Sequence, residues 1–291
     1  MRLFCFGLGY SAEALARRLS ARTGALTGTR TSVGQEPALL GAKLAPFKGD
    51  VASAEVRTLL AGATHVLVSI PPDIEGDVVL RLFRDALAAM PELAWVGYLS
   101  TVGVYGDAGG QWVDETSPLR PTSERSLRRV QAERAWLAFG KATGRRVEIF
   151  RLAGIYGPGR SIVDTLRAGT ARRIVKPGQV FNRIHVDDVA RVVAAAIDRP
   201  TRHRVYNVSD DEPAPPQDVV AYAAELLGLP VPPEIAFEAA GLGGMAATFW
   251  AECKRVDNAR IKTELGAELL YPTYREGLQA LAATRAATGA V

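Results

Sequence analysis

Short apolar runs alternate with longer amphipathic segments along most of the chain. The apolar runs have the length and composition of buried strands and comprise residues 3–6, 25–28, 42–47, 65–70, 95–99, 147–152 and 205–208. Between them, apolar residues recur with the spacing of one helix face in residues 12–19, 55–61, 77–90, 127–140 and 187–196. This alternation implies right-handed crossovers and predicts an α/β fold, a Rossmann-like doubly wound parallel sheet with helices on both faces.

The pattern loosens in the C-terminal third of the chain. The elements expected there are helices at 219–227 and 257–266 and a Pro/Gly-rich loop at 230–244. We therefore predict two regions. Residues 1–155 form the Rossmann core, to which segments near 180–210 return, and residues 156–291 form a smaller region that covers a substrate.

A glycine-rich turn, Gly-Leu-Gly-Tyr-Ser-Ala, joins the first predicted strand to the first predicted helix. Gly7 permits the tight turn, Gly9 lets the backbone approach a pyrophosphate, and Ala12 lets the helix lie close to the strand. Tyr10 and Ser11 begin the helix, whose unpaired N–H groups favour a phosphate. The turn predicts dinucleotide binding, and an ordinary glycine-containing turn is the alternative.

The second strand leads into three polar residues about twenty positions after the glycines. These are Thr29, Arg30 and Thr31, at a place where NAD-binding proteins usually carry an Asp or Glu for the ribose 2′-hydroxyl. The planar guanidinium of Arg30 and the neighbouring hydroxyls suit a 2′-phosphate, so the pattern favours NADP over NAD. A solvated surface arginine is the alternative. Asp50, which follows the third strand, could contact an adenine edge or form a turn.

Composition and charge limit the classes of molecule that the protein is expected to bind. The net charge is +4 over 291 residues, but the basic side chains are scattered and form no long run, so we expect anionic small molecules rather than nucleic acid. Apolar runs stay far below the ~20 residues of a membrane span, and we expect no membrane contact and a cytoplasmic location. The chain has only two cysteines and three histidines, without ligand spacing, so no metal site is predicted.

Several segments together resemble the extended short-chain dehydrogenases/reductases, which include the NAD-dependent epimerases and dehydratases of nucleotide sugars. In order, these segments are residues 99–107, 114–118, 151–160, 184–190, 206–208 and 257–266. Arg-Leu-Ala-Gly followed by Gly-Pro-Gly-Arg is most similar to an atypical subgroup, the YeeZ-like proteins. The resemblance covers nearly the whole chain. It implies a homodimer assembled through the helices at 77–90 and 127–140.

The chain departs from the family at its catalytic pair. The family uses a Tyr and, four residues later, a Lys, ahead of a Glu on the same helix; counted back from Glu133, these places hold Arg125 and Arg129. In the family the Lys lowers the Tyr pKa and holds the nicotinamide ribose, the Tyr transfers a proton, and a Ser or Thr orients the carbonyl. Thr101 matches that last position, and Arg129 could hold the ribose hydroxyls. Arg125 cannot act as acid or base, because a guanidinium does not deprotonate in proteins.

The proton must then come from another group. Tyr105, four residues after Thr101 at the strand end, is the first candidate, although the resemblance also allows it to pack the loop. Tyr156 is a weaker candidate and, with Arg160, is expected to contact an anionic substrate. Three further side chains could either take part in the chemistry or stabilise the structure: Glu115, Arg151 and His185.

Two functions follow from these observations. The first is an NADP-preferring oxidoreductase or epimerase-like enzyme that exchanges a hydride with a small carbonyl or hydroxyl substrate through a rebuilt acid/base site. The second is a non-catalytic NADP-binding regulatory or sensor protein, which the two arginines favour because they remove the family's proton-transfer groups. We favour the enzyme, because Rossmann proteins with a pocket usually carry chemistry on their cofactor. Nucleotide-sugar conversion by the family's ordinary mechanism is weakened by the same two arginines.

Overall fold

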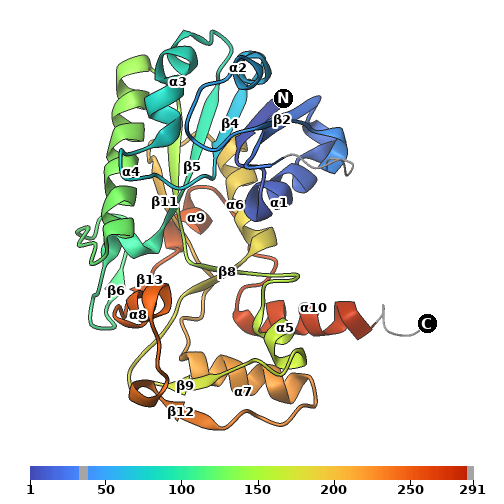
Figure 1. The fold of residues 1–291 in the computed structure, drawn as a ribbon, viewed down its shortest axis with the longest axis vertical. Helices are drawn as coiled ribbons and strands as arrows, with labels where there is room; N and C mark the ends of the chain where they lie inside the picture. Colours follow the sequence, from blue (N-terminus) through green and yellow to red (C-terminus); the bar gives the residue numbers. More distant parts are fainter. Residues whose placement is uncertain (33–38, 287–291) are drawn as a thin grey trace.

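The computed structural model describes residues 1–32 and 39–286, and its central element is a parallel seven-stranded sheet (Figure 1). The strand order is β11-β7-β5-β4-β1-β2-β3, and each neighbouring pair is parallel. The strands are β1 (Arg2–Phe6), β2 (Ala25–Arg30), β3 (Lys43–Pro46), β4 (His65–Val68), β5 (Trp95–Thr101), β7 (Val147–Leu152) and β11 (Val205–Val208). This order confirms the Rossmann-like doubly wound sheet predicted from the sequence.

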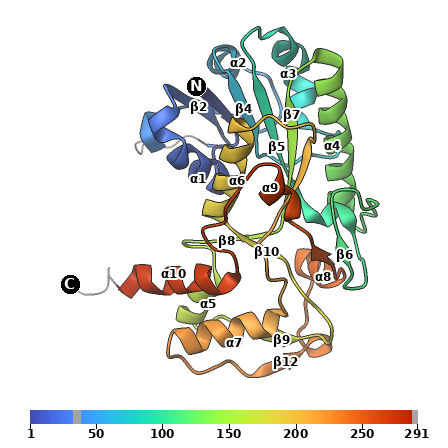
Figure 2. The same ribbon diagram turned by 180° about the vertical axis from the view of Figure 1, so that it is seen from behind.

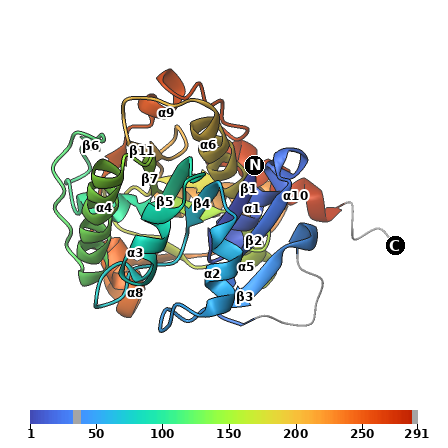
Figure 3. The ribbon, with the colours of Figure 1, turned by 90° about the horizontal axis from the view of Figure 1, so that it is seen from above.

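Helices cover both faces of the sheet, as the view from above shows (Figure 3). One face carries α1 (Tyr10–Arg18) and α6 (Val186–Asp198), and the other carries α2 (Ala54–Ala61), α3 (Val78–Ala89) and α4 (Glu124–Thr143). Side chains of β1 alternate between two cores: Leu3 and Cys5 pack with α1 and α6, whereas Phe4 and Phe6 pack with α2, α3 and α4. Burial on both sides explains why β1 is a continuous apolar run.

A smaller layer lies beyond the C-terminal ends of the strands, and we call it the lower region (Figures 1 and 2). It comprises α5 (Ile162–Arg167), β9 (Arg173–Val175), α7 (Pro216–Leu226), β12 (Glu234–Ala236), α8 (Gly244–Trp250) and α10 (Tyr274–Ala286). Side chains of α5, α7 and α10 form a core of their own. The short parallel pair β8 (Gly154–Tyr156) and β10 (Arg183–His185) lies between this layer and the sheet (Figure 2).

The remaining elements are short. They are β6 (Trp112–Val113), β13 (Arg255–Val256), α9 (Ala259–Thr263), the 3₁₀ helices Ser20–Arg22, Leu39–Gly41 and Val102–Tyr105, and the 3₁₀ helix Phe237–Ala239, which belongs to the lower region. Within the described ranges, no helix combines the length and the apolar content that crossing a membrane requires.

Several expected element boundaries differ from the structure. The expected loop at 230–244 contains β12 and a 3₁₀ helix, because a three-residue strand is too short to leave a periodic pattern. The long helix α4 begins at Glu124 rather than residue 127, since the Ser123 side chain accepts from the Ser126 N–H and caps it. Helix α6 is capped by the His185 ring rather than by either of the aspartates that follow it.

Candidate coenzyme site and active site

The glycine-rich turn after β1 has the backbone geometry of a phosphate-binding turn. Gly7 has φ +84°, and a Cβ there would lie 2.6 Å from Cγ2 of Ile70 and 2.8 Å from Oγ of Ser69, so only glycine fits. Gly9 precedes α1 in extended backbone, and no side chain caps the helix. A Cβ on Gly9 would meet no heavy atom within 4 Å. The first turn of α1 therefore has uncapped N–H groups beside open space, as anion binding requires.

The other residues of the turn differ in burial. Ala12 is fully buried in the core shared with α6. Tyr10 and Ser11 form the first turn of α1 and are half-buried. The turn thus combines a closely packed helix with a partly open N-terminus.

Thr29 stabilises the glycine-rich turn through two hydrogen bonds. Its hydroxyl accepts a hydrogen bond from the Gly7 N–H at 3.0 Å, and its carbonyl accepts one from the Leu8 N–H at 2.8 Å. Only 1% of Thr29 is exposed. Its side chain therefore supports the turn and faces inward, whereas Thr31 is exposed at the end of β2.

Arg30 lies over the outer side of the same turn. Its Nε donates to the Leu8 carbonyl at 2.9 Å, and its Nη2 forms an ion pair with Glu13 of α1. Glu13 also pairs with Arg17 at 3.1 Å, so two guanidinium groups share one carboxylate. This edge consequently carries net positive charge next to the uncapped helix end. Asp50 is exposed, and its carboxylate accepts from the Val51 N–H, which is the geometry of a turn.

The end of β5 carries the residues that the family resemblance associates with catalysis. Thr101 is half-buried, and its Oγ1 accepts from the Gly103 N–H at 3.1 Å as the strand passes into a 3₁₀ helix. Arg129 of α4 is 8% exposed, and its Nη1 donates to the Leu99 carbonyl at 2.7 Å and to the Tyr98 hydroxyl at 3.0 Å. The structure thus brings Thr101 and Arg129 to the same strand end. Arg125, one turn earlier on α4, is exposed.

Tyr105 lies in a closed polar network. Its hydroxyl donates to Oδ1 of Asn207 at 2.6 Å and accepts from Nη1 of Arg151 at 2.9 Å. Burial raises the pKa of Tyr105 to about 12. Both hydrogen-bonding directions of the hydroxyl are used inside the protein, and these contacts fit a structural role better than proton transfer to a substrate.

The same network contains residues that the sequence did not single out as a group. Arg151 forms a buried ion pair with Glu133 at 2.8 Å, and Glu133 also accepts from the Ser100 hydroxyl at 2.5 Å. The salt bridge is one of the two interpretations the sequence allowed for Arg151. Asn207 was visible only within the Tyr-Asn-Val segment of β11. The signal that could have exposed part of the cluster is Arg151, a charged residue inside the largely apolar run of β7.

Glu115 links its loop to strand β11 and helix α9 rather than facing open space. Its Oε1 accepts from the backbone N–H of Asn207 at 2.8 Å, and its Oε2 lies 3.5 Å from Nε of Arg260. Burial raises the pKa of Glu115. Within residues 1–32 and 39–286, no cluster of three or more His, Cys, Asp or Glu side chains could hold a metal ion.

The loop after β8 packs against the glycine-rich turn. The Tyr10 hydroxyl donates to the Pro158 carbonyl at 3.1 Å, and the guanidinium of Arg160 lies 5.8 Å from the Tyr10 ring centroid. A Cβ on Gly157 would lie only 2.5 Å from the Tyr10 hydroxyl. Arg160 is exposed and therefore stands beside the first turn of α1, close to where a coenzyme phosphate would bind.

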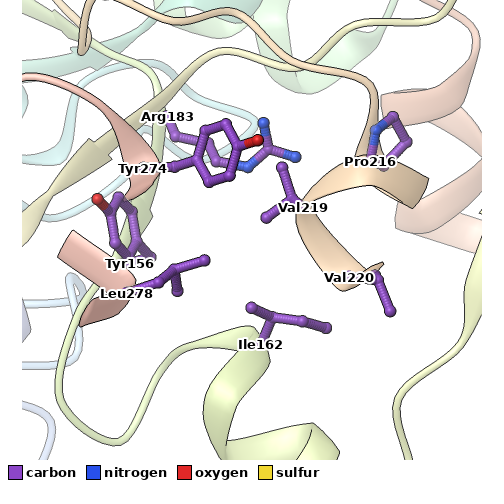
Figure 4. A pocket seen from close by; sticks show the side chains of 8 residues that line it. All are labelled: Tyr156, Ile162, Arg183, Pro216, Val219, Val220, Tyr274 and Leu278. Carbon is purple, nitrogen blue, oxygen red and sulfur yellow. The ribbon is translucent and has the colours of Figure 1, made fainter. Parts of the chain in front are cut away.

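Tyr156 and His185 lie on the paired strands β8 and β10 next to that loop. Tyr156 is 8% exposed, its hydroxyl has no hydrogen-bond partner among the described residues, and its ring lines a cavity of the lower region (Figure 4). The His185 ring meets Tyr156 edge-on at 5.2 Å, and burial lowers the pKa of His185. The sequence-predicted residues therefore fall into three places: the glycine-rich turn, the end of β5 and this cavity.

A parallel seven-stranded sheet, with an uncapped glycine-rich turn between β1 and α1, defines a Rossmann-type nucleotide-binding fold. The sequence profile of the NAD dependent epimerase/dehydratase family matches residues 9–209. The chain belongs to that family.

Similar proteins agree with this assignment. Protein YeeZ of Escherichia coli (strain K12) is 31% identical over 283 residues, covering 91% of this chain and 94% of YeeZ, which confirms the YeeZ-like resemblance. The structure of a functionally unknown conserved protein from Silicibacter pomeroyi DSS is 50% identical, with a TM-score of 0.87 over 98% of this chain and 99% of that one. UDP-glucuronic acid 4-epimerase from Bacillus cereus in complex with NAD is 18% identical, with a TM-score of 0.77 over 97% and 96% of the two chains, and shares the fold.

Proposed function

We propose that the protein binds NADP in preference to NAD and exchanges a hydride between this coenzyme and a small carbonyl or hydroxyl substrate. The observation that carries the proposal is the uncapped start of α1 at Gly9, with open space beside it and Arg30 at its edge. When bound, the nicotinamide would supply the hydride donor or acceptor. The chain's own residues bind the coenzyme and hold the substrate, and the proton that balances the hydride passes between the substrate oxygen and solvent water.

The preference for NADP rests on charge at the end of β2. Two guanidinium groups, from Arg30 and Arg17, face the single carboxylate of Glu13. A ribose 2′-phosphate beside Arg30 would gain a charge-assisted hydrogen bond, whereas a 2′-hydroxyl would gain far less. Thr31 is exposed next to Arg30 and could add a hydroxyl, and Asp50 stays a proposed adenine contact.

At the end of β5, we assign Thr101 to orienting the substrate oxygen and Arg129 to the nicotinamide ribose. Arg129 keeps Nη1 on the Leu99 carbonyl, which fixes its side chain at the strand end. A guanidinium there donates hydrogen bonds but holds no exchangeable acid/base proton at neutral pH. We assign Tyr105 as a positioning residue of this edge, because its hydroxyl already serves Asn207 and Arg151. Arg160 and Tyr156 remain proposed contacts for an anionic substrate.

The coenzyme claim is tested by fluorescence titration of the full chain with NADPH and with NADH. We expect NADPH to bind at least about tenfold tighter, and Arg30→Ala to remove most of that difference, since one charge-assisted hydrogen bond is lost. Arg202→Ala, at another exposed arginine, is the matched control and should leave both affinities unchanged. Absence of binding by either coenzyme to folded protein would refute the proposal.

A second candidate function is supported by one specific observation. Arg125 and Arg129 stand where the family has its proton-transferring Tyr and Lys, and the nearby Tyr105 hydroxyl is enclosed. A non-catalytic NADP-binding regulatory or sensor protein would keep such a site. Hydride turnover of aldehydes and sugars with saturating NADPH separates the two: turnover supports the enzyme, and tight binding without any exchange supports the sensor.

We further propose that the protein is a cytoplasmic homodimer that pairs through α3 and α4. The two helices pack beside one another on the same face of the sheet, and α4 exposes Leu127 to the extent of 40%. Light scattering should give twice the mass of one chain, and Leu127→Glu should shift the molecule toward the monomer. A monomeric mass for the wild-type chain would refute the dimer. Fractionation of cells that produce the chain tests its location.

A further inference from the structure

The lower region contains a cavity that is separate from the glycine-rich turn. It has a volume of about 190 Å³ and lies among α5, α7, α10 and the β8–β10 pair (Figure 4). Ile162, Val220 and Leu278 contribute apolar walls. A dry cavity of about 150 Å³ is large enough to hold benzene, so this one has room for a single aromatic ring with a short substituent.

One end of the cavity carries a guanidinium. Arg183 lies there beside Tyr274, 5.9 Å from the Tyr274 ring centroid, and Ile162 lies at the opposite end (Figure 4). Nη1 of Arg183 donates to the carbonyls of Phe181 at 3.0 Å and Ala214 at 3.2 Å, which fixes the side chain in place. Burial lowers the pKa of Arg183, because the charged form has lost much of its water.

No carboxylate of residues 1–32 and 39–286 forms an ion pair with Arg183, although Asp210 lies close enough to influence it. Asp210 is 2% exposed, and its Oδ2 has no hydrogen-bond partner among the described residues. Burial raises the pKa of Asp210 to about 8, so this carboxyl is mostly neutral at pH 7. The Arg183 guanidinium is therefore half-buried without a fixed anion, which is an unfavourable state that a bound anion relieves.

We propose that this cavity binds a small monocarboxylate with an apolar body the size of one aromatic ring. The carboxylate pairs with Arg183, and the body packs among Ile162, Val220 and Leu278. Tyr156, which is also a proposed substrate contact, lines the cavity, whereas Thr101 and the residues of the glycine-rich turn do not. The site therefore binds its ligand without the coenzyme and does not rest on the proposed hydride exchange.

The test uses ¹⁹F NMR of the full chain, without coenzyme, with 4-fluorophenylacetate and its neutral amide as probes. The two probes share their size and their ring and differ in charge, so their comparison isolates the contribution of Arg183. We expect the acid to bind at least about tenfold more tightly than the amide. Equal binding of the two probes, or no binding of the acid at millimolar concentration, would overturn the proposal.

Two variants locate the binding. Arg183→Met should abolish the preference for the acid. Ile162→Trp, which fills the cavity from the end opposite Arg183, should abolish binding of both probes. Arg204→Met is the matched control, since Arg204 also donates to a backbone carbonyl, that of Thr201, but does not line the cavity. If Arg183→Met fails to fold, Ile162→Trp still decides: unchanged binding in that variant would place the probe elsewhere and refute the site.

Discussion

Two edges of the same sheet differ in how completely their polar groups are satisfied. At the β1–α1–β2 edge, the start of α1 is uncapped, the space beside Gly9 is empty, and two arginines share one carboxylate. At the β5–β7–β11 edge, Tyr105, Asn207, Arg151 and Glu133 satisfy one another within a buried cluster. The first edge is arranged to receive a ligand, whereas the second is arranged to hold three strands in register.

The difference separates binding from chemistry in this member of the family. Open donors near a helix end favour an anion without any rearrangement. A closed network of buried charges gives rigidity, and its groups become available to a substrate only when existing hydrogen bonds break. The chain thus has an open, positively charged edge of the kind that coenzyme binding requires, and we expect Arg125 and Arg129 at the places of the family's Tyr and Lys.

The largest effect is expected from breaking the closed edge. Glu133→Gln leaves the Arg151 guanidinium buried without its carboxylate, and we expect a loss of about 3 kcal/mol in the free energy of unfolding. Urea denaturation followed by circular dichroism measures it. Glu225→Gln, on the exposed side of α7, is the control and should change stability by less than about 0.5 kcal/mol. Equal effects of the two substitutions would show that the network contributes no special rigidity.

The open edge is tested at Gly9, where the fold has room for a side chain. Aspartate is a preferred residue before a helix, so Gly9→Asp should leave the free energy of unfolding unchanged or raise it slightly. Its carboxylate would repel a pyrophosphate, and we expect NADPH to bind on the order of a hundredfold more weakly. Gly9→Asn has the same size without the charge and should lose less affinity. NADPH titration that finds wild-type affinity in Gly9→Asp would place the coenzyme elsewhere.

Tyr105→Phe tests whether Tyr105, in the closed edge, also donates a proton to the substrate. Removing the hydroxyl deletes hydrogen bonds to Asn207 and Arg151, and we expect a loss of about 1–2 kcal/mol in the free energy of unfolding. Hydride turnover, measured well below the melting temperature, should persist. Loss of turnover in a variant that stays folded and still binds NADPH would instead identify Tyr105 as the proton donor.

The smallest effect is expected at Glu13. Glu13→Gln removes the carboxylate that now pairs with Arg30 and Arg17, so more positive charge becomes available to a 2′-phosphate. We expect the ratio of NADPH to NADH affinity to rise about threefold to tenfold. Parallel titrations with both coenzymes measure this ratio. A fall in the ratio would mean that Glu13 orients Arg30 for the phosphate rather than competing with it.

The sequence predicted the sheet because its central strands, among them β4, β5 and β7, are largely apolar runs buried on both faces. It also located the glycine-rich turn, and the tight turn expected at Gly7 has a positive φ there. It did not predict the direction of polar side chains, because that direction depends on residues distant along the chain. Thr29 was expected to face a phosphate and instead supports Gly7, while Tyr105 meets Asn207 across 102 positions of sequence.

The short elements of the lower region left too little periodicity to detect. Strands β9 and β12 each have three residues, and they pair although they are far apart in the sequence. The cavity of the lower region is lined by five separate elements, so no local sequence motif predicts it. Arg183 could be recognised as unusual only once its surroundings were known.

The contact from Tyr10 to Pro158 has a mechanical consequence. Tyr10 sits in the first turn of α1, and Pro158 follows the strand that leads to the lower region. A displacement of the 157–160 loop would therefore pull on the helix end at which we propose that a diphosphate binds. Under the proposed function, the Tyr10 hydroxyl would couple coenzyme binding to the position of this loop.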